Sequence, residues 1–376
     1  MKVVYISNAI LPSKSANSIH IMKMCQALAD NGHEVTLLAP NYKDKIEPNV
    51  SDIFRFYGVR DNFILKKLSV PNIKGRLLLY ISGILFFLIK NKFDYVYSRF
   101  IYGSIVASIL RLENIYESHA PICVTNKIER WLFSKLIGMP SFKRLVVISG
   151  TLKRYYLEKY PNISKEIQVA HDGADPVSDF DQRAKLEGNP GGIKVGYIGH
   201  LYRGKGIEVI ENICDKVPDD IEFHIVGGTA QDVEYWKSKC NSSNVFFYGF
   251  VPQKDVSSYI NALDICLLPN QKVVRTFGSK GDIGSNIGEY TSPLKLFDYM
   301  SHRKAIISSN HEVLCEVLNT NNCLLVGADD FDAWVLALER LREEGFRNRL
   351  AEQAFRDFSK YSWKNRAKNI LGNAVI

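Results

Sequence analysis

Short apolar runs alternate along the chain with longer segments whose apolar residues recur at helical spacing. The first run, Lys2–Ser7, is rich in β-branched residues and continuous, which is typical of a buried parallel strand. A helix is expected to open at Ser18 and to stop at Asn31-Gly32, before a second strand at Glu34–Ala39. Further strands are expected at Tyr95–Ser98, Asn114–Glu117, Leu145–Ile148 and Ile167–Ala170. This β-α-β winding predicts a parallel sheet that helices cover on both faces.

The winding stops at residues 171–192, where turn formers and charges crowd together and no apolar period survives. A second cycle then begins, with strands expected at Ile193–Ile198, Glu222–Val226, Val245–Tyr248, Ile265–Leu268, Ala305–Ser308 and Cys323–Val326. The pattern therefore predicts an α/β protein with domains at 1–170 and 193–361 and a linker at 171–192. Open α/β sheets bind ligands at the carboxyl ends of their strands, so two such Rossmann-like domains are expected to face a central cleft.

Composition narrows the class of protein. The 46% apolar and 23% charged residues are ordinary for a globular protein, and the seven scattered cysteines show no zinc or disulfide spacing. No charged leader precedes the first strand, which indicates a cytoplasmic protein. The most apolar stretch, Leu77–Ile89, spans only about 20 Å as a helix, which predicts a core helix or an interfacial helix rather than a membrane span.

Charge is distributed unevenly between the two halves. Residues 1–170 hold 24 Lys and Arg against 12 Asp and Glu, whereas the remainder holds 24 against 28. A basic first half suggests an anionic partner such as a membrane surface, although solvated flanks around a core helix explain the pattern equally well. Basic residues bracket the apolar stretch: Lys66, Lys67, Lys74, Arg76, Lys90 and Lys92. No basic-aromatic module indicates nucleic acid binding.

A glycine-rich loop at Gly196–Gly206 follows a predicted strand and opens a predicted helix, an arrangement whose free amides favour an anion. Gly199 allows a close approach to the backbone, and Arg203 and Lys205 add positive charge. The run from Gly199 also fits the start of a P-loop, but Gly206 stands where the Mg²⁺-binding Ser or Thr belongs. We therefore disfavour a nucleotide hydrolase, and a plain helix start remains the simpler alternative.

A second candidate loop precedes the run Ser292–Met300. Ser292 is expected to cap a helix with Pro293 at its first position. Lys295 adds a cation, and Asp298 falls three residues later on nearly the same helix face. A carboxylate there suits sugar hydroxyl groups, but it also suits the dipole of an early helix turn.

At this point the residues resemble a known family. The runs GYIGHLYRGKGIEVI, SPLKLFDYMSHRKAIISS and YSWKNRA, together with SNAILPSKSANSIHIMKM, YESHAP and VVISGTLKRYY, are similar to retaining glycosyltransferases of the GT-B fold, glycosyltransferase family 4. Within the family, the chain resembles bacterial polysaccharide-assembly enzymes. The resemblance implies that the first domain binds a saccharide or lipid-linked acceptor, that the second binds a nucleotide sugar, and that a C-terminal helix at 362–376 packs back on the first.

The resemblance also implies residue roles in the second domain. Lys205 would contact the donor diphosphate, the amides of Ser292–Lys295 would hold the phosphates, and Asp298 would bind the ribose. The base would lie near Gly227-Gly228 and Gly249–Val251. The expected donor-binding residues are Gly199, His200, Arg203, Lys205, Gly228, Phe250, Ser292, Pro293, Leu294, Lys295 and Asp298. Two positions depart from the family pattern, which puts usual donor contacts in question: His200 replaces an Arg, and Tyr290, next to Glu289, replaces a Glu.

In the first domain, the resemblance places His119 against the donor sugar near the reacting centre, although a lone His is more often structural. The catalytic residues are thus expected to be His119, Lys205 and Asp298, with Ala16, Asn17 and Ser18 in an acceptor or phosphate loop. The family needs no cofactor and no metal, because fixed amides and cations stabilise the leaving diphosphate. The acid runs Asp172/Asp175 and Asp330/Asp332 look like a linker and a helix start rather than metal ligands.

The hypothesis is therefore a glycosyltransferase that acts with retention in bacterial surface polysaccharide synthesis, such as capsule or lipopolysaccharide. Its expected location is the cytoplasm, with a peripheral position on the inner face of the plasma membrane as the further expectation. A sugar-nucleotide epimerase of the same fold, which forms an epimerised sugar nucleotide, and a non-catalytic partner protein are the alternatives. The sequence does not name the sugar, the base, the acceptor or the oligomeric state, and a UDP-linked donor is only the commonest case.

Overall fold

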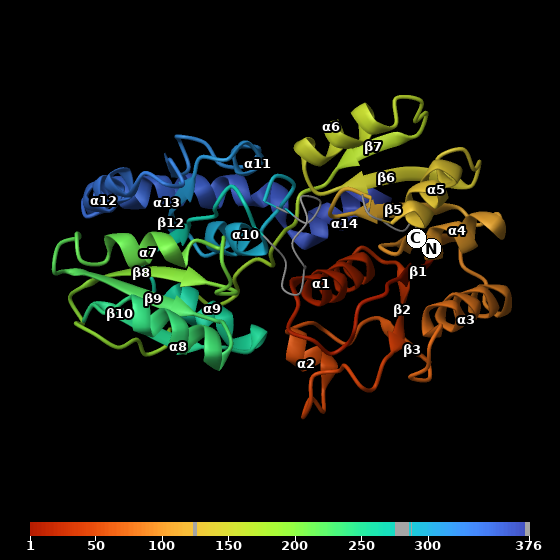
Figure 1. The fold of residues 1–376 in the computed structure, drawn as a ribbon, viewed down its shortest axis with the longest axis horizontal. Coiled ribbons are helices and arrows are strands. Elements are labelled where there is room, and N and C mark those ends of the chain that lie inside the picture. Colours follow the sequence, from red (N-terminus) through yellow and green to blue (C-terminus); the bar gives the residue numbers. More distant parts are fainter. Residues whose placement is uncertain (123–125, 275–285, 287, 373–376) are drawn as a thin grey trace. The chain divides into compact units, whose positions relative to one another are not determined.

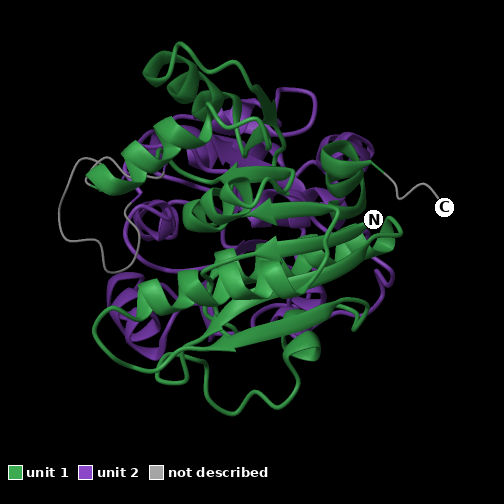
Figure 2. Ribbon diagram, turned by 90° about the vertical axis from the view of Figure 1, so that its right-hand side faces the viewer, with its two compact units in different colours: residues 1–172, 363–376 green, residues 173–362 purple. Residues whose placement is uncertain are grey.

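The computed structural model describes residues 1–122, 126–274, 286 and 288–372 of the chain. These residues form two compact units (Figure 2). Unit 1 contains Met1–Asp172 together with the segment that begins at Trp363, and unit 2 contains Gly173–Ser362. Unit 2 thus includes most of the stretch that the sequence presents as a linker.

Unit 1 is built on a parallel sheet of seven strands in the order β3-β2-β1-β4-β5-β6-β7 (Figure 1). The strands are β1 (Lys2–Ile6), β2 (Glu34–Asn41), β3 (Ile64–Ser69), β4 (Tyr95–Ser98), β5 (Asn114–Ser118), β6 (Phe142–Val147) and β7 (Glu166–Val169). Its helices are α1 (Ala16–Asp30), α2 (Ile53–Tyr57), α3 (Arg76–Lys90), α4 (Ile101–Ile109), α5 (Lys127–Leu136), α6 (Gly150–Lys159) and α14 (Trp363–Leu371). Central strands such as β5 are buried along their whole length, because helices cover both faces of the sheet.

Helix α14 belongs to unit 1 although it ends the chain. It packs along α1, where the Asn31 side-chain amide donates to the Lys364 carbonyl oxygen at 2.9 Å. Helix α3 packs elsewhere on the same sheet, where Tyr80, Ile84 and Leu88 join the apolar core formed by β1, β2, β4 and α4. The outer side of α3 stays exposed, so the apolar stretch in the sequence is half core and half surface.

Unit 2 repeats the plan with six parallel strands in the order β10-β9-β8-β11-β12-β13. The strands are β8 (Ile193–Ile198), β9 (Ile221–Val226), β10 (Val245–Gly249), β11 (Ile265–Leu268), β12 (Ala305–Ser309) and β13 (Leu324–Val326). The helices are α7 (Ile207–Ile213), α8 (Ala230–Lys239), α9 (Gln253–Asn261), α10 (Leu294–Ser301), α11 (Glu312–Cys315), α12 (Phe331–Arg340) and α13 (Glu344–Phe358), followed by the 3₁₀ turn η2 (Ser359–Tyr361). The two Rossmann-like sheets confirm the predicted fold class.

Two expected helix starts are displaced. Helix α1 begins at Ala16, because the Ser15 side chain accepts the Ser18 amide and caps it two residues earlier than expected. Helix α10 begins at Leu294 with Pro293 as its cap residue, so Ser292 is not the cap. Among the described residues, no helix is both long and apolar enough to cross a membrane.

Candidate functional site

Three loops of unit 2 meet where β8, β9 and β10 end. The Gly199 amide donates to the Val226 carbonyl oxygen at 2.9 Å, and the Gly227 amide donates to the Gly249 carbonyl oxygen at 2.7 Å. Gly227 has a φ of 120°, and a Cβ atom there would lie 2.1 Å from the Gly199 carbonyl oxygen, so only glycine fits. The fold thus brings together the predicted donor-binding positions after these strands, which include Gly199, Gly228 and Phe250.

Near this edge lie Lys205 and Lys295, which form no ion pair with a carboxylate of the described residues. The Nζ atom of Lys295 is buried, has no hydrogen-bond partner among the described residues, and lies 3.6 Å from the centre of the Tyr197 ring. Burial and the charge of Lys205 hold the pKa of Lys295 well below its ordinary value. Burial lowers the pKa of Lys205 to about 8. Burial costs the charged form of each amine free energy that no ion pair among the described residues offsets.

His200 belongs to the same cluster. Burial, Lys205 and Lys295 all lower the pKa of its imidazole, so the ring is neutral near pH 7. A neutral ring can donate or accept a hydrogen bond but adds no charge, unlike the arginine of the family pattern. The side chain of Arg203 in the same loop is exposed.

The two helix starts differ in the amides that they leave open. At α7, the Glu208 carboxylate accepts the amides of Gly204 and Gly206 at 3.0 and 3.1 Å. These two amides are therefore occupied by Glu208, and the contact of this helix start with phosphate stays a prediction. At α10, the amides of Leu294 and Lys295 have no partner among the described residues, as is normal for the first turn of a helix.

Other positions named in the sequence analysis also lie in unit 2. Asp298 lies one turn into α10, and its carbonyl oxygen accepts the His302 amide at 3.1 Å. Glu289 is exposed, Tyr290 is half-buried, and Phe250 is 43% exposed. The acid run Asp330/Asp332 is a helix start, since the Asp330 carboxylate accepts the Ala333 amide and caps α12.

In unit 1, the predicted acceptor loop is the first turn of α1. Ala16 is exposed, Asn17 is half-buried, and Ser18 is buried. The Ser18 hydroxyl lies 2.7 Å from that of Ser13 and donates to the Ile10 carbonyl oxygen at 3.1 Å. Ser18 therefore holds the preceding loop against the helix.

His119 follows β5 and is held by Glu117. Its Nε2 atom lies 2.5 Å from Glu117 Oε1, and one-fifth of its side chain is exposed. Burial together with the nearby Arg99 and His20 lowers the pKa of His119 to about 3, despite the opposing pull of Glu117. The ring is thus neutral in the physiological range.

His119 is part of a buried cluster that the sequence analysis did not foresee. His20, Glu117 and His119 each offer a potential metal-ligand atom within 4.8 Å of one another. Asp172, from the acid run assigned to the linker, lies 2.9 Å from His20. One sequence signal could have indicated this cluster: a glutamate inside the apolar strand NIYES.

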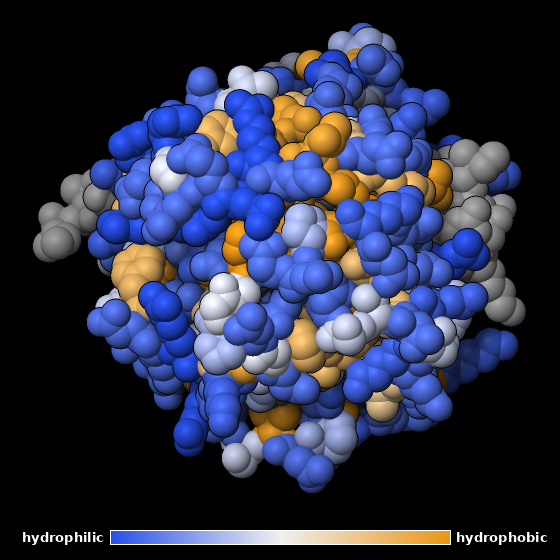
Figure 3. All heavy atoms as spheres, turned by 90° about the vertical axis from the view of Figure 1, so that its left-hand side faces the viewer, coloured by the Kyte–Doolittle hydropathy of each residue, from blue (hydrophilic) through white to orange (hydrophobic). Residues whose placement is uncertain are grey.

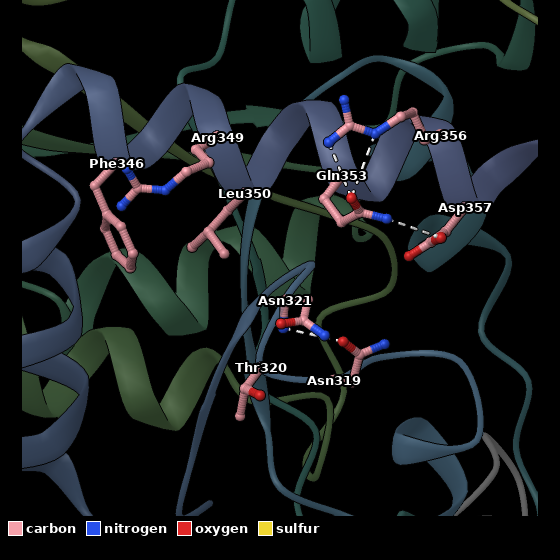
Figure 4. Close-up of a pocket in the computed structure, with 9 residues that line it drawn as sticks. All are labelled: Asn319, Thr320, Asn321, Phe346, Arg349, Leu350, Gln353, Arg356 and Asp357. Carbon is pink, nitrogen blue, oxygen red and sulfur yellow. Dashed lines mark hydrogen bonds between the residues drawn. The ribbon is translucent and has the colours of Figure 1, made fainter.

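A groove on unit 2 does not coincide with the predicted donor-binding residues. It has a volume of about 490 Å³ and lies between the 319–321 loop and α13 (Figure 4). Gln353 in its wall bonds Arg356 and Asp357. None of the predicted donor-binding residues lines it.

Comparison with known proteins agrees with the geometry. Residues 18–177 match the model of Glycosyltransferase Family 4, and residues 192–344 match that of Glycosyl transferases group 1. The chain is therefore a glycosyltransferase of the GT-B fold, as the sequence predicted. Its first half carries the family 4 domain and its second half the group 1 domain.

Three similar proteins illustrate the range of the fold. The uncharacterized glycosyltransferase MJ1069 of Methanocaldococcus jannaschii is 22% identical, and the match covers 98% of this chain and 96% of that protein. The GPI3 subunit of phosphatidylinositol N-acetylglucosaminyltransferase of Saccharomyces cerevisiae is also 22% identical, over 74% of this chain and 64% of that protein. The structure of Anabaena Alr3699/HepE in complex with UDP has a TM-score of 0.69 at 11% identity, covering 98% of both chains.

Proposed function

We propose that this glycosyltransferase takes a UDP-linked sugar as its donor and transfers the sugar, with retention and without a metal, to a saccharide or lipid-linked acceptor in bacterial surface polysaccharide synthesis. The observation that carries the proposal is the Lys295 Nζ atom, which is buried without a hydrogen-bond partner among the described residues and is close enough to Lys205 for the two charges to act on each other. Both lysines are positions that the family pattern assigns to the donor phosphates.

A diphosphate fits this environment for electrostatic reasons. Two cations that have lost hydration gain most from a ligand that carries two negative charges in a compact group. The open amides of Leu294 and Lys295 at the start of α10 offer hydrogen bonds of the right polarity. The structure of Anabaena HepE, which shares the fold, contains UDP, and this supports the choice of base.

In this proposal, the two lysines and the open amides of α10 also stabilise the leaving group of the reaction. Breaking the anomeric bond places growing negative charge on the departing diphosphate. Cations and amides that are already fixed in place stabilise that charge without reorganising, which is the role that a metal ion fills in other transferases. In this proposal, Asp298 binds the ribose hydroxyl groups, and His119 contacts the transferred sugar near the reacting carbon.

A product assay tests the proposal. The protein is incubated with a panel of nucleotide sugars in EDTA, with lipid-linked and saccharide acceptors, and the products are separated by mass. We expect free UDP and a glycosylated acceptor, and we expect Lys205→Ala to cut transfer by on the order of 10²-fold, the scale of losing one charge-stabilising group. Lys216→Ala, which removes an exposed lysine of the same unit, is the control and should transfer normally.

Two results of that assay would overturn the proposal. An epimerised sugar nucleotide without transfer to an acceptor would favour the hypothesis of a sugar-nucleotide epimerase. Normal turnover by Lys205→Ala would remove the assigned role of the lysine.

We further propose that unit 1 docks on an anionic membrane surface through α3, α4 and α5. Helix α3 packs on α4, and α4 packs on α5. Large apolar side chains on these three helices face solvent: Leu77, Leu78, Leu79, Phe86, Ile89, Ile109, Ile128 and Trp131. Leu78 is 68% exposed and Phe86 is 62% exposed, values unusual for side chains of this size on a surface without a partner.

Charge complements this apolar surface. Lys74 and Arg76 precede or begin α3, Lys90 ends it, and Lys127 and Lys135 lie on α5. An apolar helix bracketed by lysine and arginine suits an interface with acidic lipid, where each nearby basic residue contributes about 1 kcal/mol. The GPI3 subunit of S. cerevisiae is named for a transfer to phosphatidylinositol, and this relative supports a lipid-linked acceptor.

A further inference from the structure

Five side chains of unit 1, four of them buried and the fifth half-buried, form one network of charges and imidazoles, which we call the Glu117 network. Its members are His20, Glu117, His119, Asp172 and Arg366. They come from α1, β5 and its following loop, the end of the first segment of unit 1, and α14. The side chains of His20, Glu117 and Arg366 are each no more than 2% exposed.

Glu117 is the centre of the network. Its Oε1 atom accepts from Arg366 at 2.7 Å and lies 2.5 Å from His119 Nε2 and 3.0 Å from His20 Nε2. Its Oε2 atom accepts from the Tyr97 hydroxyl. Burial alone would raise the pKa of Glu117, but Arg366, His20 and His119 together hold it well below its ordinary value, so the carboxylate is ionised.

An ionised Glu117 determines which nitrogen of His119 carries the proton. The pKa of His119 is lowered to about 3, so its ring holds one proton at neutral pH. A carboxylate oxygen at 2.5 Å can only accept, and therefore the proton belongs on Nε2. Nδ1 then presents a lone pair, and within the described residues it has no hydrogen-bond partner.

Arg366 keeps Glu117 in place. Besides Glu117, its guanidinium donates to the carbonyl oxygens of Ala170 and His171 at 3.1 and 2.8 Å. These three oxygen acceptors, together with the Met24 sulfur at 3.0 Å, use the fork geometry of arginine, which a lysine cannot reproduce in full. The last helix of the chain thus supplies the cation that orients a residue after β5.

A metal ion is the alternative occupant of this cluster. The potential ligand atoms of His20, Glu117 and His119 are close enough together to share an ion. However, the Glu117 oxygen that would bind the metal already accepts from the Arg366 cation at 2.7 Å. A divalent ion would have to displace the guanidinium or lie against it, so the contacts favour a hydrogen-bonded network.

We propose that Glu117, anchored by Arg366, is a positioning residue that fixes His119 with its proton on Nε2, so that Nδ1 accepts a hydrogen bond from a hydroxyl group of the transferred sugar. The inference rests on the proposed function, because it assumes that His119 meets the donor sugar. It assigns Glu117 and Arg366 a role through His119 rather than contact with substrate.

The test is nuclear magnetic resonance of the full chain with ¹⁵N-labelled histidine. The chain has eight histidines, and His119→Gln identifies the signals of His119 by their loss. We expect a neutral ring protonated at Nε2 and unprotonated at Nδ1, unchanged by EDTA. A ring protonated at Nδ1, a mixture of the two forms, or signals that move when EDTA is added would overturn the proposal.

Two variants of Arg366 separate positioning from folding. Arg366→Lys keeps the cation and should keep the tautomer and most of the activity. Arg366→Met should give a mixture of tautomers and a kcat lower by about tenfold, the scale of one neutral hydrogen bond, with a much smaller loss of donor affinity because the donor lysines lie in unit 2. Equal kcat in the two variants would contradict the inference.

Melting temperatures check that both variants fold, and the wild-type spectrum decides the question if Arg366→Met does not. Calorimetric titration with UDP-sugar keeps the two proposals apart. A protein that binds no donor refutes the proposed function, whereas one that binds donor but shows the wrong tautomer refutes only the inference about Glu117.

Discussion

At the residue scale, the most informative feature is a pair of lysines whose amines are buried and which form no ion pair with a carboxylate in the part of the chain that the structure describes. Lys205 and Lys295 each have a lowered pKa, and burial is the first cause in both cases. In a folded protein a buried ammonium is normally paired with an anion, because burying an unpaired one costs several kcal/mol of folding free energy. An anionic ligand offsets that cost, and we therefore expect the folded protein to bind one.

The lowered pKa of Lys205 makes donor binding dependent on pH. Below its pKa of about 8 Lys205 is a cation, and above that value it becomes neutral. The diphosphate needs the cation, so we expect the Kd for UDP-sugar to rise as pH increases from 7 to 9. The bound anion raises the lysine pKa again, and binding near pH 8 should therefore take up a proton.

Calorimetry at several pH values, in buffers of different ionisation enthalpy, measures both effects. Lys205→Arg is the matched variant, because its guanidinium stays charged and should flatten the profile. A wild-type Kd that stays constant between pH 7 and 9 would contradict the assigned role of Lys205.

Residue patterns can nominate candidates within short motifs, but they do not reveal contacts between distant segments of the chain. Lys205, Lys295 and Asp298 stand in short contiguous motifs, so they could be named from the sequence. Glu117 and Arg366 are 249 positions apart, and only the packing of α14 in unit 1 brings them within 2.7 Å. One sequence without an alignment contains no local signal for such a pair.

At the element scale, the apolar pattern located the buried strands closely. Strands β4, β8 and β11 have the predicted bounds, because their residues are apolar and covered on both faces. Strand β3 was missed, since it lies at the edge of its sheet and contains Lys66 and Lys67 in an exposed or half-buried setting. Edge strands commonly carry such charges, which interrupt the apolar signal.

Helix starts were harder to predict, because several residues compete to cap one turn. Ser15 takes the place expected of Ser18 at α1, and Pro293 takes that of Ser292 at α10. At α7, the decisive residue is Glu208, which folds back on the amides of Gly204 and Gly206. The glycine-rich motif predicts an anion-binding edge of the sheet, but it gives no signal that Glu208 occupies these two amides.

At the scale of the whole molecule, the exposed apolar side chains are unevenly shared. Four large ones are exposed among the described residues of unit 2: Tyr235, Phe250, Val273 and Leu336. The face turned to the viewer in Figure 3 is mostly hydrophilic, with apolar side chains emerging in places. Unit 1 instead gathers most of its exposed apolar side chains on α3, α4 and α5.

Vesicle flotation tests whether this surface meets a membrane. We expect the protein to float with vesicles that contain acidic phospholipid and much less with neutral ones, and added salt should weaken the binding. The double variant Leu78→Ser/Phe86→Ser should lose most of the recovery. Leu336→Ser, which changes a similarly exposed leucine of unit 2, should float like the wild type.

Equal recovery with acidic and neutral vesicles would remove the electrostatic part of the proposal. Normal flotation of the double variant would show that the α3 surface is not the one that docks.

The central claim concerns how the donor is held, and one titration tests it most directly. UDP-sugar is titrated into the wild-type protein and into Lys295→Ala in the presence of EDTA. We predict that the wild type binds without a divalent metal and that the variant loses at least tenfold in affinity, because charged hydrogen bonds contribute about 1.5–3 kcal/mol. Binding that EDTA abolishes, or equal affinity in both proteins, would contradict the account.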